Sequence, residues 1–249
     1  MTAFRDLHAT GIFVMPNPWD IGSATTLASL GFPALATTSS GHAASLGKED
    51  QKVTLDELVA HAAAVVAAVD VPLNVDAEYC FSADIVGIGP VVRRLASTGA
   101  AGLSIEDFNP FAGVINPVEV AAERVAAAAD AAHDEDLVLT ARAENLLYGA
   151  GDLDDTITRL LAYRDAGADV VYAPGLVDLS QIATVVAEVG VPVNVLILSG
   201  GPSIPELAAA GVRRVSTGGA LARSAYAEFR RLATALLAAA ESARLDGQA

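Results

Sequence analysis

Two acidic residues, Asp76 and Glu78, stand two positions apart at the end of a short apolar run, residues 71–78. The run predicts a buried strand, and because side chains alternate between the two faces of a strand, both carboxylates would leave it on the same side. Two carboxylates held that close repel each other unless a cation or a shared proton compensates them. A hard divalent cation such as Mg²⁺ prefers oxygen ligands, so the pair indicates a metal site.

The elements around this pair alternate between apolar, strand-like runs and helix-like segments. Runs such as residues 191–198 are apolar almost without interruption, which is typical of parallel strands buried on both faces. Eight strand–helix units in 249 residues predict one domain, residues 1–249, with an α/β fold of the (β/α)₈ TIM-barrel type. The expected strands are 11–15, 33–39, 71–78, 101–106, 137–143, 168–173, 191–198 and 212–216, and the expected helices are 21–30, 54–69, 86–98, 117–133, 153–166, 179–189, 204–210 and 220–240. Residues 40–52 and 107–116 are expected to form polar loops.

The composition excludes several classes of partner. A formal net charge of −15 argues against nucleic acid, whose phosphates need a basic surface, and against anionic membranes. No apolar run approaches the roughly 20 residues that span a bilayer, and the first residues lack the apolar segment of a signal peptide. Cys80 is the single cysteine, so no intrachain disulfide can form and the cytoplasm is the default location. An anionic small molecule stays open as a substrate, because one arginine or a metal reverses the field inside a cleft.

The last expected helix, residues 220–240, is apolar around much of its circumference. A helix of that kind is usually buried on more than one side. The apolar residues that do not share one stripe are Leu221, Tyr226, Phe229, Leu232, Leu236 and Leu237. We therefore expect this helix to pack against a neighbouring subunit.

The active sites of such barrels lie at the carboxyl ends of the strands, so the residues there are the candidates for chemistry. Four acids, Asp50, Asp76, Glu78 and Glu106, follow neighbouring expected strands, and Arg142 follows the fifth. The acids would hold a divalent metal, largely through its waters, the metal would chelate a 2-oxo acid, and Arg142 would bind a carboxylate. Such a site stabilises an enolate, the species formed when a C–C bond next to a carbonyl breaks.

Plainer interpretations of these residues stay open. Asp76 and Glu78 would also suit a solvated strand end. Asp50 lies in a charged loop, where a solvated acid is equally expected, and Glu106 follows a strongly apolar strand, where its role could be purely structural. The anionic partner that an arginine at a barrel mouth needs would be a substrate or the nearby Glu144.

The cysteine and the histidines are weaker candidates for catalysis. Cys80 fits a small packing residue better than a nucleophile. His61 and His133 lie in expected helices as surface or hydrogen-bonded residues, and nothing singles out His42 as a base. A Schiff-base aldolase needs a lysine at a strand end, and both lysines lie in the loop after the second expected strand. The glycines at 199–202 and 217–219 would suit a phosphate site, but glycines also end strands for steric reasons.

Several ordered motifs together resemble the isocitrate lyase/phosphoenolpyruvate mutase superfamily. The resemblance extends from about residue 13 to residue 222 and includes Asn-Pro-Trp-Asp, Asn-Val-Asp-Ala-Glu, Leu-Ser-Ile-Glu-Asp and Ala-Arg-Ala-Glu-Asn. The motifs occupy residues 17–20, 22–23, 31–41, 46–47, 50, 74–78, 102–107, 141–145, 166–169, 192–195 and 211–216.

The resemblance implies a barrel whose eighth helix is swapped between the subunits of a homodimer or homotetramer. It implies Mg²⁺, with Mn²⁺ as an alternative, near Asp76, with Glu78, Glu106 and Asp50 in the coordination or water shell. It places Arg142 on a carboxylate of the substrate. The remaining substrate-binding residues that it implies are Trp19, Asp20, Ser39, Ser40, Gly41 and Asn194.

The sequence departs from the superfamily in the loop 107–116. Isocitrate, 2-methylisocitrate and dimethylmalate lyases have a Lys-Lys/Arg-Cys-Gly-His motif there, with an acid/base cysteine, and phosphonopyruvate enzymes have a lysine. This loop contains no Cys, Lys or His. What remains, a metal site without the cysteine, resembles the oxaloacetate-decarboxylase-like members of the superfamily. Loss of CO₂ forms an enolate without a base that removes a proton.

We therefore expect a Mg²⁺-dependent carbon–carbon lyase or decarboxylase acting on a small 2-oxo or 2-hydroxy di- or tricarboxylate through a metal-stabilised enolate. In this interpretation Asp50, Asp76, Glu106 and Arg142 are the catalytic residues. Two alternatives stay open: a phosphonopyruvate-type P–C mutase or hydrolase, and a barrel that binds anions without turnover.

Overall fold

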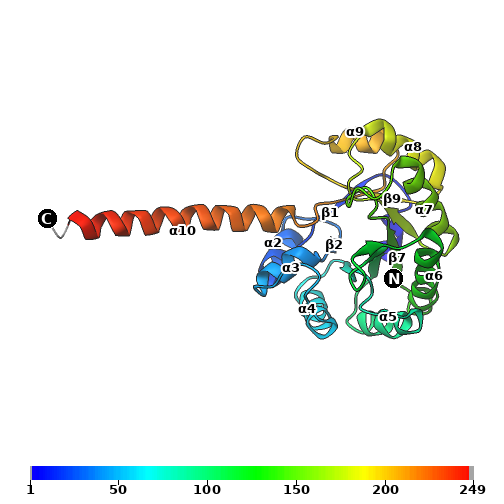
Figure 1. The fold of residues 1–249 in the computed structure, drawn as a ribbon, viewed down its shortest axis with the longest axis horizontal. Helices are drawn as coiled ribbons and strands as arrows, with labels where there is room; N and C mark the ends of the chain where they lie inside the picture. Colours follow the sequence, from blue (N-terminus) through cyan, green and yellow to red (C-terminus); the bar gives the residue numbers. More distant parts are fainter. Residues whose placement is uncertain (1, 247–249) are drawn as a thin grey trace.

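The computed structural model describes residues 2–246, with side chains from residue 4 to residue 241. Its central feature is an eight-stranded sheet in the order β1-β10-β9-β8-β7-β4-β3-β2, in which every neighbouring pair is parallel. The two edge strands approach each other, because the Ala36 N–H donates to the Pro16 carbonyl at 3.1 Å. The sheet is thus a nearly closed barrel with helices around it, and the predicted (β/α)₈ fold is confirmed (Figure 1).

The strands and helices follow the predicted alternation. The barrel strands are β1 (Phe13–Met15), β2 (Leu35–Ala36), β3 (Leu73–Asp76), β4 (Gly102–Glu106), β7 (Val138–Arg142), β8 (Val170–Tyr172), β9 (Val193–Leu196) and β10 (Arg214–Ser216). The helices are α1 (Thr2–Asp6), α2 (Ile21–Ser29), α3 (Ser39–Ser45), α4 (Leu55–Ala68), η1 (Ile85–Gly87), α5 (Ile88–Ala96), α6 (Val118–Asp134), α7 (Leu153–Asp165), α8 (Leu179–Val189), α9 (Ile204–Ala209) and α10 (Ala220–Asp246).

Local capping sets several helix starts. The Thr54 hydroxyl accepts from the Glu57 N–H, and the Glu57 carboxylate accepts from the Thr54 N–H, which forms a capping box at the start of α4. Ser203 and Glu206 form the same box at α9. At the other end, Gly190 ends α8 with a left-handed φ of 69°, a conformation that glycine adopts without strain.

The interior of the barrel has an apolar base. Phe4 of α1 packs with Phe13, Val138 and Val170 into a small cluster that is separate from the larger core between strands and helices. Gly102 is required beside it, because a Cβ there would lie 2.8 Å from Phe4 Cε1 and 2.7 Å from the Val138 carbonyl. Apolar side chains therefore fill the N-terminal end of the barrel.

The structure corrects three local predictions. The segment 40–52 is not wholly a loop, because residues 39–45 form α3. Strand β3 ends at Asp76, and Glu78 has a left-handed φ of 49°, so strand alternation does not set the direction of its side chain. The loop 107–116 contains a short antiparallel hairpin, β5 (Phe108–Asn109) with β6 (Val114–Ile115).

Helix α10 extends away from the barrel as one long rod (Figure 1). Phe229, Leu236 and Leu237 are 70%, 73% and 62% exposed on it, although large apolar side chains are normally covered. Cover by a second subunit stays a prediction.

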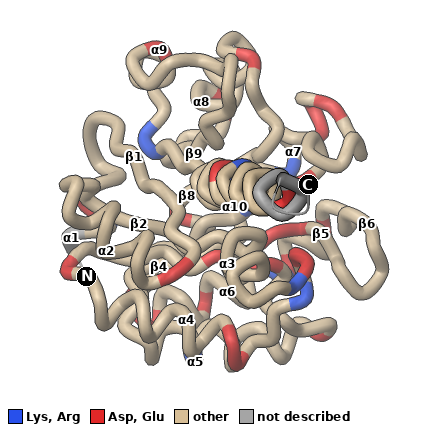
Figure 2. The backbone as a smooth tube through the Cα atoms, turned by 90° about the vertical axis from the view of Figure 1, so that its left-hand side faces the viewer, with Lys and Arg blue, Asp and Glu red and all other residues tan. Residues whose placement is uncertain are grey.

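Figure 2 views the helix end-on and shows many more acidic than basic positions on the tube. No helix in the described part of the chain is both long and apolar enough to cross a membrane.

Candidate active site

A cavity of about 340 Å³ opens at the carboxyl ends of the barrel strands. The predicted site residues that line it are Ser39, Ser40, Asp50, Asp76, Arg142 and Asn194. Glu78 instead faces a neighbouring cavity of about 330 Å³, beside Gln51, Tyr79 and Phe111. The fold thus gathers residues from widely separated parts of the sequence at the predicted end of the barrel.

Arg142 lies at the centre of a cluster of acids. Its guanidinium is 2.7 Å from Asp76 Oδ1, 2.7 Å from Glu144 Oε1 and 3.3 Å from Glu106 Oε2. All four side chains are largely buried, with exposures of 2–15%. The sequence left a substrate or Glu144 as the partner of Arg142, and the structure shows Glu144 together with two of the predicted metal-site acids.

The carboxylates outnumber this one cation, and their pKa values show it. Burial, followed by repulsion from Asp76 and Asp50, raises the pKa of Glu78 to about 8. Burial also raises the pKa of Glu106, against the opposing effect of Arg142, and burial with the charge of Asp76 raises that of Asp50. Acids that retain protons near neutral pH would lose those protons to solvent when a cation binds.

The donor set fits a hard divalent ion of the Mg²⁺ type. Within the described residues, no three His, Cys, Asp or Glu side chains converge as a preformed metal cluster. Mg²⁺ does not need one, because it commonly binds through one or two carboxylates and keeps several waters. Asp76 and Asp50 both face the cavity and would supply those carboxylates. The Gln51 amide already donates to Glu106 Oε1 at 2.9 Å, which leaves that acid less free.

Three of the predicted substrate-binding residues stand outside this cavity. Asp20 is the N-cap of α2 and accepts from the Ser23 N–H at 2.7 Å. A Cβ on Gly41 would lie 2.6 Å from Thr38 Cγ2 and 3.0 Å from the Cβ of Trp19, so this glycine lets α3 pack closely. Binding of substrate by Trp19, Asp20 and Gly41 stays a prediction.

Ser39 and Ser40 begin α3 at the rim of the cavity. The Ser39 N–H donates to Asp76 Oδ2 at 3.2 Å, and the Ser40 hydroxyl lies 3.3 Å from that of Thr38. Arg142 and the Ser39 N–H both donate to Asp76. An anionic substrate would compete with Asp76 for these two donors.

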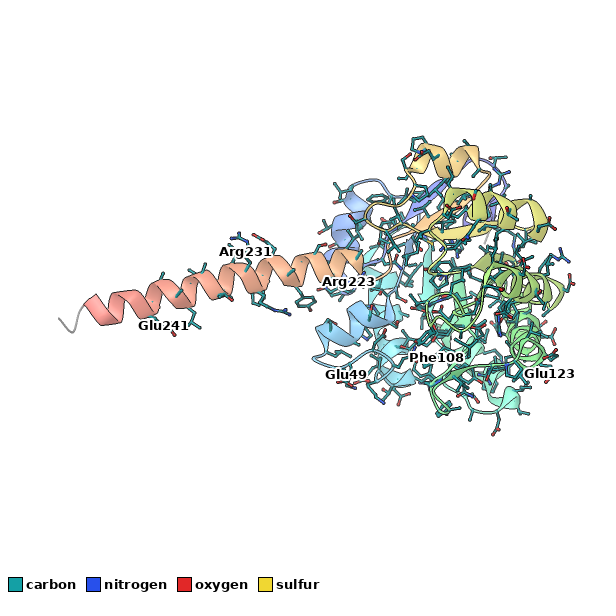
Figure 3. All side chains as sticks on the ribbon, turned by 45° about the horizontal axis from the view of Figure 1, so that its top comes forward. Glu49, Phe108, Glu123, Arg223, Arg231 and Glu241 are labelled. Atoms are coloured by element: carbon teal, nitrogen blue, oxygen red, sulfur yellow. The ribbon has the colours of Figure 1, made fainter. Side chains whose placement is uncertain are left out.

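The site includes polar residues that the sequence did not single out for this role. Glu144 follows Arg142 by two positions, and that spacing was the available signal. Arg214 faces the interior from β10, and Arg223 lines the rim of the cavity where α10 leaves the barrel (Figure 3). Nothing in the sequence marks Arg214 apart from its neighbour Arg213 except the alternation of the strand.

The loop after β4 is anchored by Asp107, which precedes the hairpin, and by Phe108 in the first strand of the hairpin. Asp107 accepts from the Tyr163 hydroxyl at 2.6 Å, from Arg159 at 3.1 Å and from the Glu144 N–H at 2.8 Å. The ring of Phe108 stacks on Tyr148, with centroids 4.4 Å apart and planes at 9°. The loop is thus held against β7 and α7 by buried hydrogen bonds and by a partly exposed aromatic pair.

Neither Cys80 nor the histidines of α3 and α4 fit an acid/base role in this site. Cys80 is fully buried, and burial raises the pKa of its thiol to about 12. His61 is buried, not a surface residue, and its Nε2 has no partner in the described chain. It stacks on His42 with ring centroids 3.8 Å apart, and burial followed by the charge of His42 lowers its pKa to about 4.

Comparison with known proteins agrees with this architecture. Residues 4–237 match the family described as phosphoenolpyruvate phosphomutase. An uncharacterised protein of Mycobacterium tuberculosis strain CDC 1551 is 36% identical over 219 residues, which cover 87% of this chain and 81% of that protein. An oxaloacetate decarboxylase of Pseudomonas putida strain GB-1 is 30% identical over 230 residues, covering 87% of this chain and 77% of that protein.

The fold is shared with solved structures. A proposed lyase/mutase from Burkholderia cenocepacia J2315 superposes with a TM-score of 0.89 at 50% identity, over 93% of this chain and 86% of that one. The family match covers most of the chain, and the barrel and the sequence motifs agree with it. The chain is therefore an enzyme of the phosphoenolpyruvate mutase/isocitrate lyase superfamily, a superfamily of lyases and mutases.

Proposed function

We propose that the chain is a Mg²⁺-dependent carbon–carbon lyase or decarboxylase that acts on a small 2-oxo or 2-hydroxy di- or tricarboxylate. Mn²⁺ would suit the same oxygen ligands. The observation that carries the proposal is the cluster around Arg142, in which three buried acids share one cation beside an open cavity. A divalent ion and a carboxylate would each relieve part of that imbalance.

The residues of the chain have distinct tasks in this proposal. Asp76 and Asp50 hold the metal, with Glu78 and Glu106 near it as acceptors for its waters. Arg142 exchanges its single contact with Asp76 Oδ1 for a carboxylate of the substrate, which a guanidinium can bind through two N–H groups. When bound, the metal supplies a Lewis acid for the carbonyl oxygen of the substrate.

Decarboxylation suits a site without an acid/base loop. The bond between the leaving carboxylate carbon and its neighbour breaks, CO₂ departs, and the electron pair remains on the substrate as an enolate. No protein base has to remove a proton in that step. The loop 107–116 has no Cys, Lys or His, and the similarity to an oxaloacetate decarboxylase supports the same choice.

The test is a metal-supplemented screen of oxaloacetate, 2-methylisocitrate, isocitrate and phosphonopyruvate, with excess chelator as the control. We expect Mg²⁺-dependent loss of CO₂ or C–C cleavage, abolished by Asp76→Ala. Full turnover by Asp76→Ala would refute the assignment. The phosphonopyruvate alternative has its own support in the family match, and phosphorus NMR of the products would reveal it. Tight binding of oxalate with Mg²⁺ and no turnover of any acid would indicate a barrel that only binds anions.

A further inference from the structure

Arg214 is a buried cation without an acidic partner. Its side chain is 2% exposed, and within the described residues no carboxylate lies at salt-bridge distance from it. Its Nε donates to Asn194 Oδ1 at 2.9 Å, its Nη2 donates to Thr140 Oγ1 at 2.8 Å, and its Nη1 lies 3.3 Å from His8 Nε2. All three partners are neutral groups, whereas buried charges in proteins are normally paired.

His8 cannot supply a negative charge or share the proton. Its Nδ1 lies 2.9 Å from the Phe4 carbonyl and donates to it, so its Nε2 accepts from Arg214. Burial, with the nearby charge of Arg214, lowers the pKa of His8 to about 3. Burial also lowers the pKa of Arg214, to about 9, so the guanidinium remains protonated at neutral pH.

The guanidinium has hydrogen-bonding capacity left. Arginine carries five N–H groups, and the described chain engages three of them. The Thr140 hydroxyl accepts from Arg214 and keeps its own proton available for donation. Two guanidinium N–H groups and one hydroxyl therefore remain as donors around a single positive charge.

These donors line the same cavity as Asp76 and Arg142 of the acid cluster. The lower wall of this cavity is polar, whereas barrel interiors are usually filled by branched apolar side chains. Its residues are buried and come from five strands: Asn74, Ser104, Thr140, Asn194 and Arg214. Thr140 and Arg142 are two positions apart on β7, so the two levels are separated by about 6.5 Å along the strand.

We propose that Arg214 and Thr140 form a second anion subsite, at the floor of the cavity, that binds a carboxylate group. A carboxylate is planar with two acceptor oxygens, which suits a guanidinium that offers N–H groups on one edge. The acid cluster above the subsite repels anions. An anion must therefore pass that cluster before it can bind at the floor of the cavity. The separation of the two levels is comparable to the length of a four-carbon dicarboxylate, one end of which would lie at Arg142. That use of the subsite rests on the proposed function, whereas binding of a carboxylate does not.

The first experiment measures binding of formate to the full chain by calorimetry, in excess chelator and at constant ionic strength. It needs no turnover, so it is independent of the proposed reaction. We expect Arg214→Met to weaken formate binding by about tenfold or more. The matched control is Arg213→Met, because Arg213 immediately precedes β10 and its Nη1 donates to the Gly11 carbonyl at an exposed position. Unchanged formate affinity in Arg214→Met would overturn the proposal, as would an equal loss in both variants.

A crystal of the wild-type chain soaked in bromide covers the case in which Arg214→Met does not fold. Anomalous scattering is expected beside the Arg214 guanidinium, and bromide confined to other sites would overturn the proposal. A kinetic measurement then distinguishes the source of the carboxylate. Formate that raises only KM identifies the subsite with the substrate's own carboxylate, and formate that changes only kcat identifies a separate small anion.

Discussion

Replacing Arg142 with glutamine tests the electrostatics of the acid cluster directly. The substitution leaves Asp76, Glu106 and Glu144 without the cation that each contacts within 3.3 Å. Removing one partner of a buried ion pair typically costs about 3–5 kcal/mol of unfolding free energy. We expect a loss in that range at pH 8 in the absence of metal.

The loss should shrink in acid. Arg142 opposes the rise in pKa that burial causes at Glu106 and Glu144, so its removal raises both values further. A carboxyl group whose pKa is higher in the folded than in the unfolded state takes up a proton on folding, and its contribution to stability falls as pH rises between the two values. At pH 5.5 the folded variant holds these protons already, so less of the charge remains uncompensated.

The assay is urea unfolding of wild type and Arg142→Gln at pH 5.5 and pH 8, with chelator and with Mg²⁺. The matched control is Arg94→Gln, which removes an exposed ion pair with Asp56 and should change stability by less than about 0.5 kcal/mol. Mg²⁺ should recover part of the loss, because it places a cation beside Asp76. An equal loss at both pH values, or no effect of Mg²⁺, would refute the reasoning.

Three further outcomes are expected. Tyr163→Phe deletes the hydroxyl that donates to Asp107 at 2.6 Å and should lower the unfolding free energy by about 1.5–3 kcal/mol in urea; a loss within error of zero would contradict the anchoring role. The metal-free chain should lose stability from pH 5 to pH 7.5, because the pKa of Glu78 is raised to about 8. Glu78→Gln should reduce the slope of unfolding free energy against pH by up to about 1.4 kcal/mol per pH unit. An unchanged slope would exclude Glu78 as the cause. The double substitution of Phe229 and Leu236 by glutamate should give a smaller species in sedimentation than wild type, unless α10 makes no contact between subunits.

The barrel could be predicted from the sequence because its strands carry a strong local signal. Runs such as residues 191–198 are apolar throughout, and glycine, proline and capping residues separate them from the helices. Short elements without such a signal were not predicted. Helix α3 begins with Ser-Ser-Gly-His, which reads as a loop, and α1 is five residues long. Tertiary packing against Trp19 and Thr38 holds α3 in place, and a sequence pattern does not report that packing.

The sequence indicated which candidate residues would lie together, but not which of them would pair. Asp76, Arg142 and Asn194 line one cavity, as the strand ends required. The sequence placed Asp76 and Glu78 on one strand face, but the strand ends between them and Glu78 turns into a different cavity. The partner of Arg142 could not be chosen from sequence, since substrate and Glu144 are equally compatible with its charge.

Asp107 shows how an acid beside a candidate site can serve to anchor a loop. It is adjacent to Glu106 and lies at the start of the loop in which other superfamily lyases carry their acid/base cysteine. The side chain is nevertheless 3% exposed, and its two oxygens accept from a tyrosine, an arginine and a backbone N–H. Those three hydrogen bonds favour the ionised form of Asp107, against the effect of burial, and hold both of its oxygens. The hairpin beyond Asp107 also lacks a titratable side chain, so the proposed reaction would take its proton from water and not from this loop.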